Sequence, residues 1–281
     1  MTSLPLTYLF VPGNRPERFA KAATSGAHAV ILDLEDAVAP DQKVEAREAV
    51  GLWLSARQAG GVPALVRIND AATPWFEEEL DWLGRVVPDG VMLPKAEDPD
   101  VPRRVARLLP KGCALVPLVE TARGVAAARE IAAVPGVQRL AFGTIDYALD
   151  LDLPDDERGL LYPASILAIE SRRAGLAAPI AGVTAALDDP ARLLADWAFA
   201  QATGFSAKMC IHPAQVLALN QAMRPTASDL DWARRVLAAA EASPGAARVD
   251  GRMVDKPVLL KAQALLARTW PDSVQTAPTS L

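Results

Sequence analysis

Short apolar runs alternate with longer amphipathic segments along most of the chain. The short runs are apolar on both faces and bounded by Gly, Pro or Asp, which is typical of parallel strands covered on both sides. They span residues 7–11, 29–33, 64–68, 90–93, 114–119, 139–142, 180–183 and 207–210. The amphipathic segments between and after them predict helices over residues 16–24, 41–58, 74–86, 98–109, 121–133, 157–174, 190–203 and 213–223. Eight consecutive strand–helix units predict a (β/α)8 TIM barrel, and an open doubly wound sheet is the alternative.

After residue 223 the pattern changes. Arg224, Pro225 and Thr226 end the last helix of the barrel pattern, and two further helices are predicted over residues 228–242 and 257–268. The segment shows no second core. We therefore expect a catalytic barrel domain over residues 1–223 and a short helical C-terminal extension, or lid, over residues 224–281.

Composition narrows the possible chemistry. The formal net charge of -5 does not favour binding to nucleic acid or to an anionic membrane surface, and no apolar stretch is long enough for a membrane span. Two cysteines cannot build a disulfide framework, which favours a reducing cytoplasm. With His28 and His212 as the only histidines, catalysis would depend on carboxylates, arginines or a hard metal ion.

In a barrel of this kind, catalytic side chains lie at the C-terminal ends of the strands. Glu120 and Asp146 follow successive predicted strands, which places them as neighbours on one rim. Two carboxylates without Cys or His nearby suit Mg²⁺ or Mn²⁺, with water and substrate oxygens as further ligands. The alternative is structural: a helix N-cap at Glu120-Thr121 and a carboxylate satisfied by its loop at Asp146.

Arg67 ends the third apolar run, where an unpaired charge would be costly. Its fork geometry fits a substrate carboxylate or keto acid. The alternative is an ion pair with the acidic group Asp33, Glu35 and Asp36, and both roles can hold at once. Because three nearby carboxylates repel one another, we expect one or two at most to contact a ligand. The others would orient Arg67, Lys95 or metal-bound waters.

A basic group follows the first strand. Arg15, Arg18 and Lys21 lie at a helix start on an otherwise acidic protein and could receive a phosphate, or could form a solvated helix face. His212 precedes Pro213 at a strand–helix junction, where a structural hydrogen bond close to the site is expected. No P-loop or dinucleotide fingerprint is present in the turn after the first strand.

The strand-end sequences together resemble the citrate lyase β-subunit-like family of HpcH/HpaI aldolases, over nearly the whole chain and in order. They are Leu9-Phe10-Val11-Pro12-Gly13-Asn14, Leu32-Asp33-Leu34-Glu35-Asp36-Ala37-Val38, Val66-Arg67-Ile68-Asn69, Leu93-Pro94-Lys95, Val119-Glu120-Thr121-Ala122-Arg123-Gly124, Phe142-Gly143-Thr144-Ile145-Asp146-Tyr147, Lys208-Met209-Cys210-Ile211-His212-Pro213 and Asp250-Gly251-Arg252-Met253-Val254-Asp255-Lys256-Pro257. The resemblance implies a (β/α)8 barrel of a metal-dependent lyase.

That family implies cleavage of a 3-hydroxyacyl-CoA thioester, of the citramalyl-CoA or malyl-CoA type, to acetyl-CoA or a related acyl-CoA and a 2-keto acid. By resemblance, Glu120 and Asp146 are the Mg²⁺ ligands and Arg67 is the catalytic clamp on the keto acid. Asp255 matches a catalytic aspartate that is often delivered over a neighbouring subunit's site. A homo-oligomer, a homotrimer or hexamer, is therefore expected.

The residues that would contact coenzyme A and the substrate match the family less completely than the metal ligands do. Arg18 and Lys21 fall where basic residues of the family contact the phosphates of coenzyme A. Glu17 stands where some relatives have a lysine, and Phe10 stands where some have a tyrosine that contacts substrate. The resemblance therefore implies a CoA thioester as substrate, with a weakened phosphate pattern and no hydroxyl contact at Phe10.

Two other functions stay open. One is a true citrate lyase β subunit that acts on a citryl thioester of an acyl carrier protein within a complex. The presence of Asp255 in the C-terminal extension favours the CoA enzyme over this alternative. The other is a non-catalytic CoA-ester-binding or scaffold protein, against which the intact set of Arg67, Glu120 and Asp146 argues.

Overall fold

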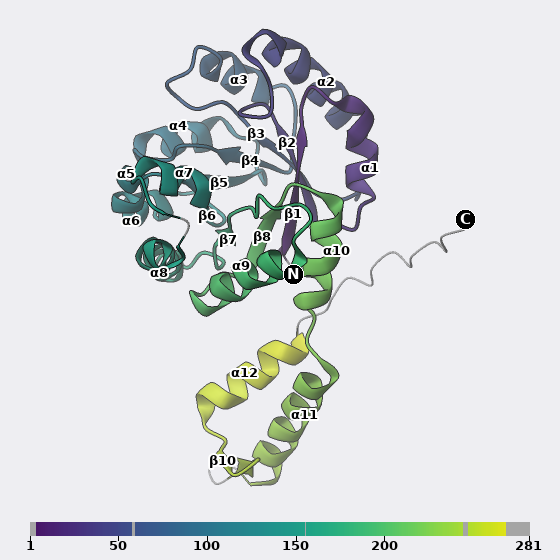
Figure 1. Ribbon diagram of the computed structural model, residues 1–281, viewed down its shortest axis with the longest axis vertical. Coiled ribbons are helices and arrows are strands. Elements are labelled where there is room, and N and C mark those ends of the chain that lie inside the picture. The colour runs from purple at the N-terminus through teal and green to yellow at the C-terminus, as the bar shows by residue number, and fades with distance from the viewer. Residues whose placement is uncertain (1–3, 58–59, 155, 244–246, 268–281) are drawn as a thin grey trace, which may run out of the picture. The chain divides into compact units, whose positions relative to one another are not determined.

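Eight parallel strands form a closed barrel in chain order in the computed structural model, which describes residues 4–57, 60–154, 156–243 and 247–267 (Figure 1). The strands are β1 (Thr7–Pro12), β2 (Ala29–Asp33), β3 (Ala64–Arg67), β4 (Gly90–Leu93), β5 (Ala114–Val119), β6 (Ala141–Phe142), β7 (Ile180–Ala181) and β8 (Ala207–Cys210). Because β1 pairs with both β2 and β8, the sheet has no free edge. The predicted (β/α)8 barrel is confirmed, and the open sheet is excluded.

Helices surround the barrel and connect the strands. They are α1 (Phe19–Ala23), α2 (Lys43–Ala56), α3 (Phe76–Leu83), α4 (Asp100–Leu108), α5 (Ala122–Ala126), α6 (Ala128–Ala132), α7 (Thr144–Asp150), α8 (Arg158–Arg173), α9 (Pro190–Ala202) and α10 (Pro213–Ala222), with short 3₁₀ helices η1 (Pro16–Arg18) and η2 (Pro40–Gln42) before α1 and α2. No helix in the described part of the chain is long and apolar enough to cross a membrane.

Helix α7 is an element that the sequence pattern did not predict. Apart from Ala148, apolar and acidic residues alternate with a period of two over residues 145–153, which does not suggest a helix. In the structure β6 ends at Phe142, and Asp146 lies in the first turn of α7. Asp146 is therefore positioned by a helix start rather than by a strand end.

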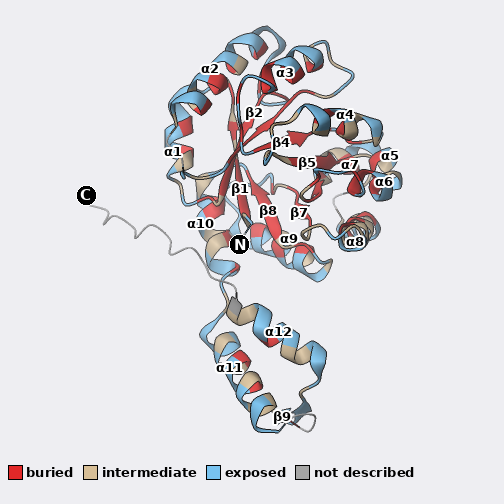
Figure 2. Cartoon of the chain, turned by 180° about the vertical axis from the view of Figure 1, so that it is seen from behind, coloured by how far each residue is buried: buried red, intermediate tan, exposed pale blue. Residues whose placement is uncertain are grey.

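The interior of the barrel is an apolar core. Alternate residues of each strand point inward, and the inward set consists of Tyr8, Ala29, Ile31, Leu65, Met92, Val116, Leu118, Ala141, Ile180, Ala207 and Met209. The residues between them face the helices, so the strands are buried on both sides while each helix buries one side (Figure 2). This double burial explains why the strands read as uninterrupted apolar runs.

The residues from Asn220 onward belong to a second compact unit, separate from Pro5–Leu219. It contains α11 (Ala227–Ala242), the short antiparallel strands β9 (Arg248–Val249) and β10 (Arg252–Met253), and α12 (Lys256–Ala267). Contrary to expectation, this unit has a small apolar cluster of its own, formed by Ala233, Val236 and Ala262. Partly buried apolar side chains, among them Trp232, Leu259 and Leu265, pack against these three residues.

Arg139 ties strand starts together on the side of the barrel opposite the predicted site. Its side chain is fully buried and donates to the backbone carbonyls of Pro5 (2.8 Å) and Ala178 (2.9 Å) and to Ser206 Oγ (2.8 Å). These acceptors lie just before β1, β7 and β8. One guanidinium therefore donates hydrogen bonds to backbone carbonyls that lie outside the hydrogen bonding between the strands.

We expect Arg139→Met to lower the free energy of unfolding by about 3 kcal/mol or more, because the buried carbonyls lose their charged donor. Urea denaturation of the two proteins measures the difference. Arg107→Met, on the exposed side of α4, is the matched control and should change stability by about 0.5 kcal/mol or less. Equal losses in the two variants would contradict the bracing role of Arg139.

Candidate active site

The alternation that builds the core also directs polar side chains into the mouth of the barrel. Leu65 points inward on β3, so Arg67, two residues later, points the same way. Asp33 follows Ile31 on β2 by the same spacing, and Glu120 follows Leu118 just after β5. All three are at least nine-tenths buried. The C-terminal mouth of the barrel thus holds a cation between carboxylates, where sites of this fold lie.

Asp33 binds Arg67 through a bidentate ion pair. Its Nε and Nη2 each donate to one Asp33 oxygen at 2.7 Å. The remaining nitrogen, Nη1, lies 2.8 Å from Glu35 Oε2 and 3.3 Å from the exposed Asp36. Burial acts to lower the pKa of the Arg67 guanidinium, but the charges of Asp33 and Glu35 outweigh it and raise the pKa. Arg67 therefore stays a cation in a fixed orientation, and the predicted ion pair is present.

The aromatic ring of Phe10 packs against one face of the Arg67 guanidinium. The Arg67 Cζ atom lies 4.8 Å from the centre of the Phe10 ring, a cation–π arrangement. With Asp33 holding Nε and Nη2 and the ring covering one face, Nη1 is paired with Glu35 and with the exposed Asp36. A ligand carboxylate would reach Nη1 by displacing the exposed Asp36. Phe10 thus lies at the mouth of the barrel, where its ring contacts Arg67.

Glu35 is buried beside this cation without a hydrogen-bonded partner for one oxygen. Its Oε2 lies close to Arg67 Nη1, but the approach is not aligned as a hydrogen bond. Burial raises the pKa of Glu35 to about 8, although the positive charge of Arg67 opposes this shift. Glu35 is therefore a group that can carry a proton near neutral pH.

The loop that carries Glu35 is held by residues to which sequence reasoning gave no role. The buried Lys43 donates from Nζ to the carbonyls of Leu34 (2.8 Å) and Glu35 (2.7 Å). Asn69 donates to the same Leu34 carbonyl at 3.0 Å and is itself held by Glu79 through two contacts. Lys43 acts on backbone oxygens alone, and Asn69 joins the Leu34 carbonyl to the carboxylate of Glu79, so no local sequence motif marks these residues.

Glu120 is fixed by backbone groups on two sides. Its Oε1 accepts the backbone N–H of Lys95 at 2.7 Å, and Lys95 adopts a left-handed φ of 44° to direct that N–H. A Cβ at position 143 would lie 2.5 Å from Glu120 Cβ and 2.6 Å from its Oε2, so only glycine fits there. Thr121, rather than Glu120, caps the following helix α5.

Asp146 lies close enough to Glu120 for its charge to affect the pKa of Glu120. Burial raises the pKa of Glu120 to about 7; the Lys95 N–H opposes this shift, and the negative charge of the half-buried Asp146 adds to it. No group of three acidic, histidine or cysteine side chains that could hold a metal lies within the described residues. The protein thus offers a pair of carboxylates, one with Oε2 beside Gly143, to which water and substrate oxygens could be added.

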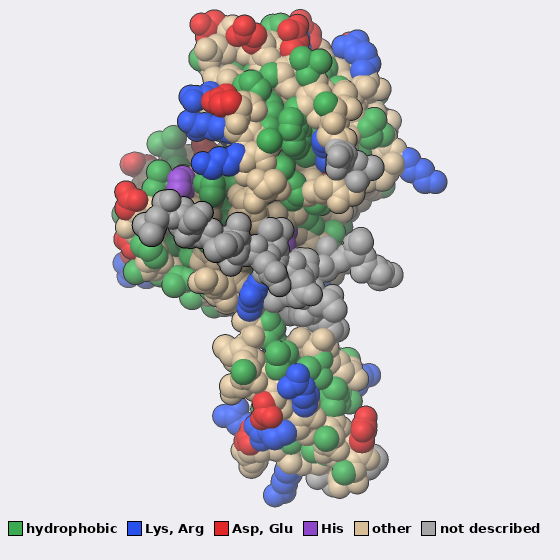
Figure 3. Space-filling view, turned by 90° about the vertical axis from the view of Figure 1, so that its right-hand side faces the viewer, with side chains coloured by type: hydrophobic (Ala, Val, Ile, Leu, Met, Phe, Trp, Pro, Cys, Tyr) green, Lys and Arg blue, Asp and Glu red, His purple; other side chains and the backbone are tan. Residues whose placement is uncertain are grey.

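The other predicted site residues lie further out. Lys95 Nζ is 3.7 Å from Asp70, and the exposed His212 accepts the backbone N–H of Ala214 at 3.2 Å, a local structural contact. Arg18 and Lys21 are exposed, and Arg18 lies 3.8 Å from Glu17. On the face drawn in Figure 3, basic side chains form small groups among acidic and apolar ones. No broad basic surface is visible on that face.

Asp255 lies in the C-terminal unit. Its Oδ1 accepts the backbone N–H of Val258 at 3.0 Å, which caps the first turn of α12. The capping contact orients the carboxylate at the helix start and leaves the second oxygen, Oδ2, for another partner.

We expect the pH dependence of stability to report the buried Glu35, measured with chelator present. Its pKa is about 8 in the folded protein and 4.5 ordinarily, so folding takes up a proton between these values. This contribution to stability is complete below pH 4.5 and is lost as pH rises toward about 8.

Urea denaturation between pH 5 and pH 8.5 should therefore show a flatter pH profile for Glu35→Gln than for the unmodified protein. Glu45→Gln, an exposed change on α2, should leave the profile unaltered. Identical slopes for the unmodified protein and Glu35→Gln would contradict a protonated Glu35.

Comparison with known proteins gives a consistent result. Residues 6–213 match the family model described as HpcH/HpaI aldolase/citrate lyase. A citrate lyase subunit beta-like protein of Deinococcus radiodurans is 39% identical over 272 residues, covering 92% of this chain and 95% of that protein. A (3S)-malyl-CoA thioesterase of Cereibacter sphaeroides is 32% identical, covering 92% of this chain and 93% of the relative.

A solved structure agrees over almost the full length. The crystal structure of CitE from Mycobacterium tuberculosis, described as a complex with magnesium, acetoacetate and coenzyme A, superposes with a TM-score of 0.80. The two sequences are 34% identical, and the match covers 95% of this chain and 98% of that one. The likeness therefore includes both the barrel and the C-terminal segment.

Proposed function

Because the chain belongs to the HpcH/HpaI aldolase/citrate lyase family, we propose that it is a Mg²⁺-dependent carbon–carbon lyase. The substrate is a 3-hydroxyacyl-CoA thioester of the citramalyl-CoA or malyl-CoA type, and the products are acetyl-CoA or a related acyl-CoA and a 2-keto acid. The observation that carries the proposal is the fixed guanidinium of Arg67 beside the carboxylate of Glu120.

Glu120 and Asp146 would hold the metal ion. The donor set is all oxygen, as Mg²⁺ and the alternative Mn²⁺ prefer, and Glu120 Oε2 lies in a space that Gly143 keeps open. When bound, the ion would act as a Lewis acid toward the hydroxyl and carboxylate oxygens of the substrate. The relative of known structure that is described as a magnesium complex supports this assignment.

Arg67 would bind the carboxylate of the part that leaves as the keto acid. Asp33 and the Phe10 ring keep the guanidinium in one orientation before the substrate arrives. The substrate carboxylate would displace the exposed Asp36 from Nη1. Such preorganisation reduces the entropic cost of aligning the bond that breaks. Phe10 contributes through Arg67, which accounts for a side chain without a hydroxyl at this position.

In the reaction the 3-hydroxyl loses its proton and the bond between C2 and C3 breaks. The electron pair stays on C2, next to the thioester carbonyl, and that carbon takes up a proton. We assign this protonation to Asp255, which would remove the same proton in the reverse direction. Its capped position at the start of α12 gives the carboxylate a defined orientation within the C-terminal unit.

Coenzyme A would enter along the start of α1. Arg18 and Lys21 are exposed and available to its phosphates, but Glu17 lies close to Arg18 and weakens the local positive charge. Binding of coenzyme A would therefore depend on few phosphate contacts. A homotrimer or hexamer, in which Asp255 reaches a neighbouring subunit's site, completes the proposal.

A panel of hydroxyacyl-CoA thioesters tests the reaction, with products identified by mass spectrometry in the presence of Mg²⁺. A lyase releases pyruvate, glyoxylate or oxaloacetate together with an acyl-CoA. Release of free coenzyme A and the intact hydroxy acid would instead show a thioesterase, the activity in the name of one relative. Cleavage of citryl carrier protein alone would favour the citrate lyase β subunit. No product from any thioester would favour the binding or scaffold protein.

We expect Glu120→Gln and Asp146→Asn each to lower the Mg²⁺-dependent rate by about 100-fold or more, because each removes a charged oxygen ligand. Steady-state kinetics and circular dichroism should show lost turnover in a folded protein. Glu130→Gln, an exposed change on α6, should keep full activity. Unchanged rates in both site variants would refute the metal assignment.

Asp255→Asn should keep substrate binding and lower turnover by about 100-fold or more, since the amide cannot transfer the proton. The asparagine can still cap α12, so the C-terminal unit should remain folded. A mixture of Asp255→Asn and Glu120→Gln subunits should regain part of the activity if Asp255 acts across subunits. A normal rate for Asp255→Asn would rule out its role as the acid.

A further inference from the structure

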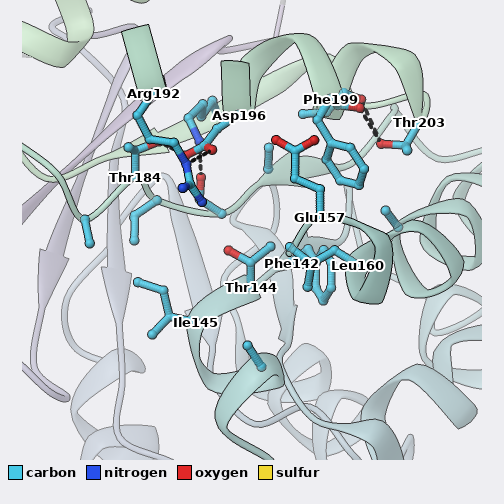
Figure 4. Close-up of a pocket in the computed structure, with 18 of the residues that line it drawn as sticks. Phe142, Thr144, Ile145, Glu157, Leu160, Thr184, Arg192, Asp196, Phe199 and Thr203 are labelled. Atoms are coloured by element: carbon cyan, nitrogen blue, oxygen red, sulfur yellow. Dashed lines mark hydrogen bonds and ion pairs between the residues drawn. The ribbon is translucent and has the colours of Figure 1, made fainter. Parts of the chain in front are cut away.

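A cavity of about 490 Å³ lies outside the barrel, between the sheet and the helices α8 and α9. Its walls include Phe142 from β6, Leu160 from α8 and Phe199 from α9 (Figure 4). The volume is in the range of small-molecule sites. Arg67, Glu120 and Asp146, which are proposed for the lyase reaction, do not line this cavity. The cavity is therefore separate from these three residues.

The cavity exists because small side chains occupy the layer between sheet and helices. Ile180 points into the barrel, so its neighbour Ala181 points outward and fills little of that layer. Ala164 on α8 and Ala200 on α9 line the same space. Larger side chains at these positions would pack α8 and α9 against the outer face of the sheet and close it.

A buried ammonium group lies in the wall of this cavity. Ala207 and Met209 face the barrel interior, so Lys208 faces outward, with 2% of its surface exposed. Its Nζ donates to the carbonyl of Gly182 at 2.7 Å, and within the described residues no carboxylate lies within ion-pair distance. An ammonium has three donors, so Lys208 has capacity for an acidic partner.

Asp196 is the acidic residue with the largest electrostatic effect on Lys208, but its carboxylate is hydrogen-bonded to other groups. One of its oxygens accepts the Thr184 hydroxyl at 2.5 Å, and the other accepts Arg192 Nε at 2.7 Å. Burial lowers the pKa of Lys208 to about 8, and the charge of Asp196 only partly offsets this. In Figure 4 the group of Thr184, Arg192 and Asp196 lies at one side of the cavity, away from the aromatic rings.

We propose that this cavity binds a small carboxylic acid with an apolar chain. The ligand's carboxylate would accept hydrogen bonds from Lys208 Nζ, and its chain would lie against Phe142, Leu160 and Phe199. A neutral apolar ligand would fill the space but leave the buried ammonium with unused donors, which is costly. The site is additional to the proposed lyase site and does not depend on it.

Isothermal titration calorimetry of the full chain with hexanoate tests the proposal, with hexanamide as the neutral ligand of the same shape. We expect hexanoate to bind and hexanamide to bind about 10-fold more weakly or worse, since it lacks the charged acceptor. Absence of hexanoate binding at millimolar concentration, or equal affinity for the two ligands, would overturn the proposal.

Two variants locate the binding. Lys208→Met keeps the apolar stem and removes the charge, so hexanoate affinity should fall about 10-fold or more, whereas the exposed change Lys111→Met should have no effect. Ala200→Leu fills the cavity and should abolish binding of both ligands without loss of thermal stability. Hexanoate binding that survives Ala200→Leu refutes the site, even if Lys208→Met fails to fold. Lyase activity of the unmodified protein is a separate readout, so either proposal can fail alone.

Discussion

The buried ion pair of Arg67 with Asp33 is the constraint on which the mouth of the barrel depends. Two unit charges buried at the end of β2 and β3 would each be costly alone, and removing one partner of such a pair costs about 3–5 kcal/mol. The pair therefore fixes the register of the strand ends, where Asp33 and Arg67 are direct neighbours in the ladder. The third nitrogen of Arg67, Nη1, is paired with Glu35 and with the exposed Asp36.

The surrounding residues serve this arrangement. Lys43 and Asn69 hold the loop after β2 through its carbonyls, so that Glu35 is kept beside Arg67 although the loop carries a second acid, Asp36. On the other side of the mouth, the N–H of Lys95 and the missing side chain of Gly143 fix Glu120. A rigid cation and a rigid carboxylate then face the same space, which is what binding a keto acid and a divalent ion together requires.

The sequence predicted the barrel well, because parallel strands covered on both sides read as apolar runs that no helix period explains. It also indicated an ion pair of Arg67 with Asp33, Glu35 and Asp36 as the alternative to a contact with substrate, since a charge on a core strand needs partners. It did not predict α7, whose sequence alternates like a strand. It also did not predict the roles of Lys43, whose Nζ donates to backbone carbonyls, and of Lys95, whose backbone N–H donates to Glu120. The cavity beside Lys208 depends on the spacing of helices and sheet, which no local pattern records.

Binding of a 2-keto acid to the magnesium-loaded protein tests the central claim, that the Asp33 contact prepares Arg67 to bind a carboxylate. Titration calorimetry with pyruvate should give an affinity about 10-fold or more lower for Asp33→Asn than for the unmodified protein, because the amide nitrogen would face a donor of Arg67, Nε or Nη2, in either orientation. Asp36→Asn, whose side chain is exposed and lies 3.3 Å from Nη1, should bind pyruvate within a few-fold of normal. Equal affinities for Asp33→Asn and the unmodified protein would contradict the account.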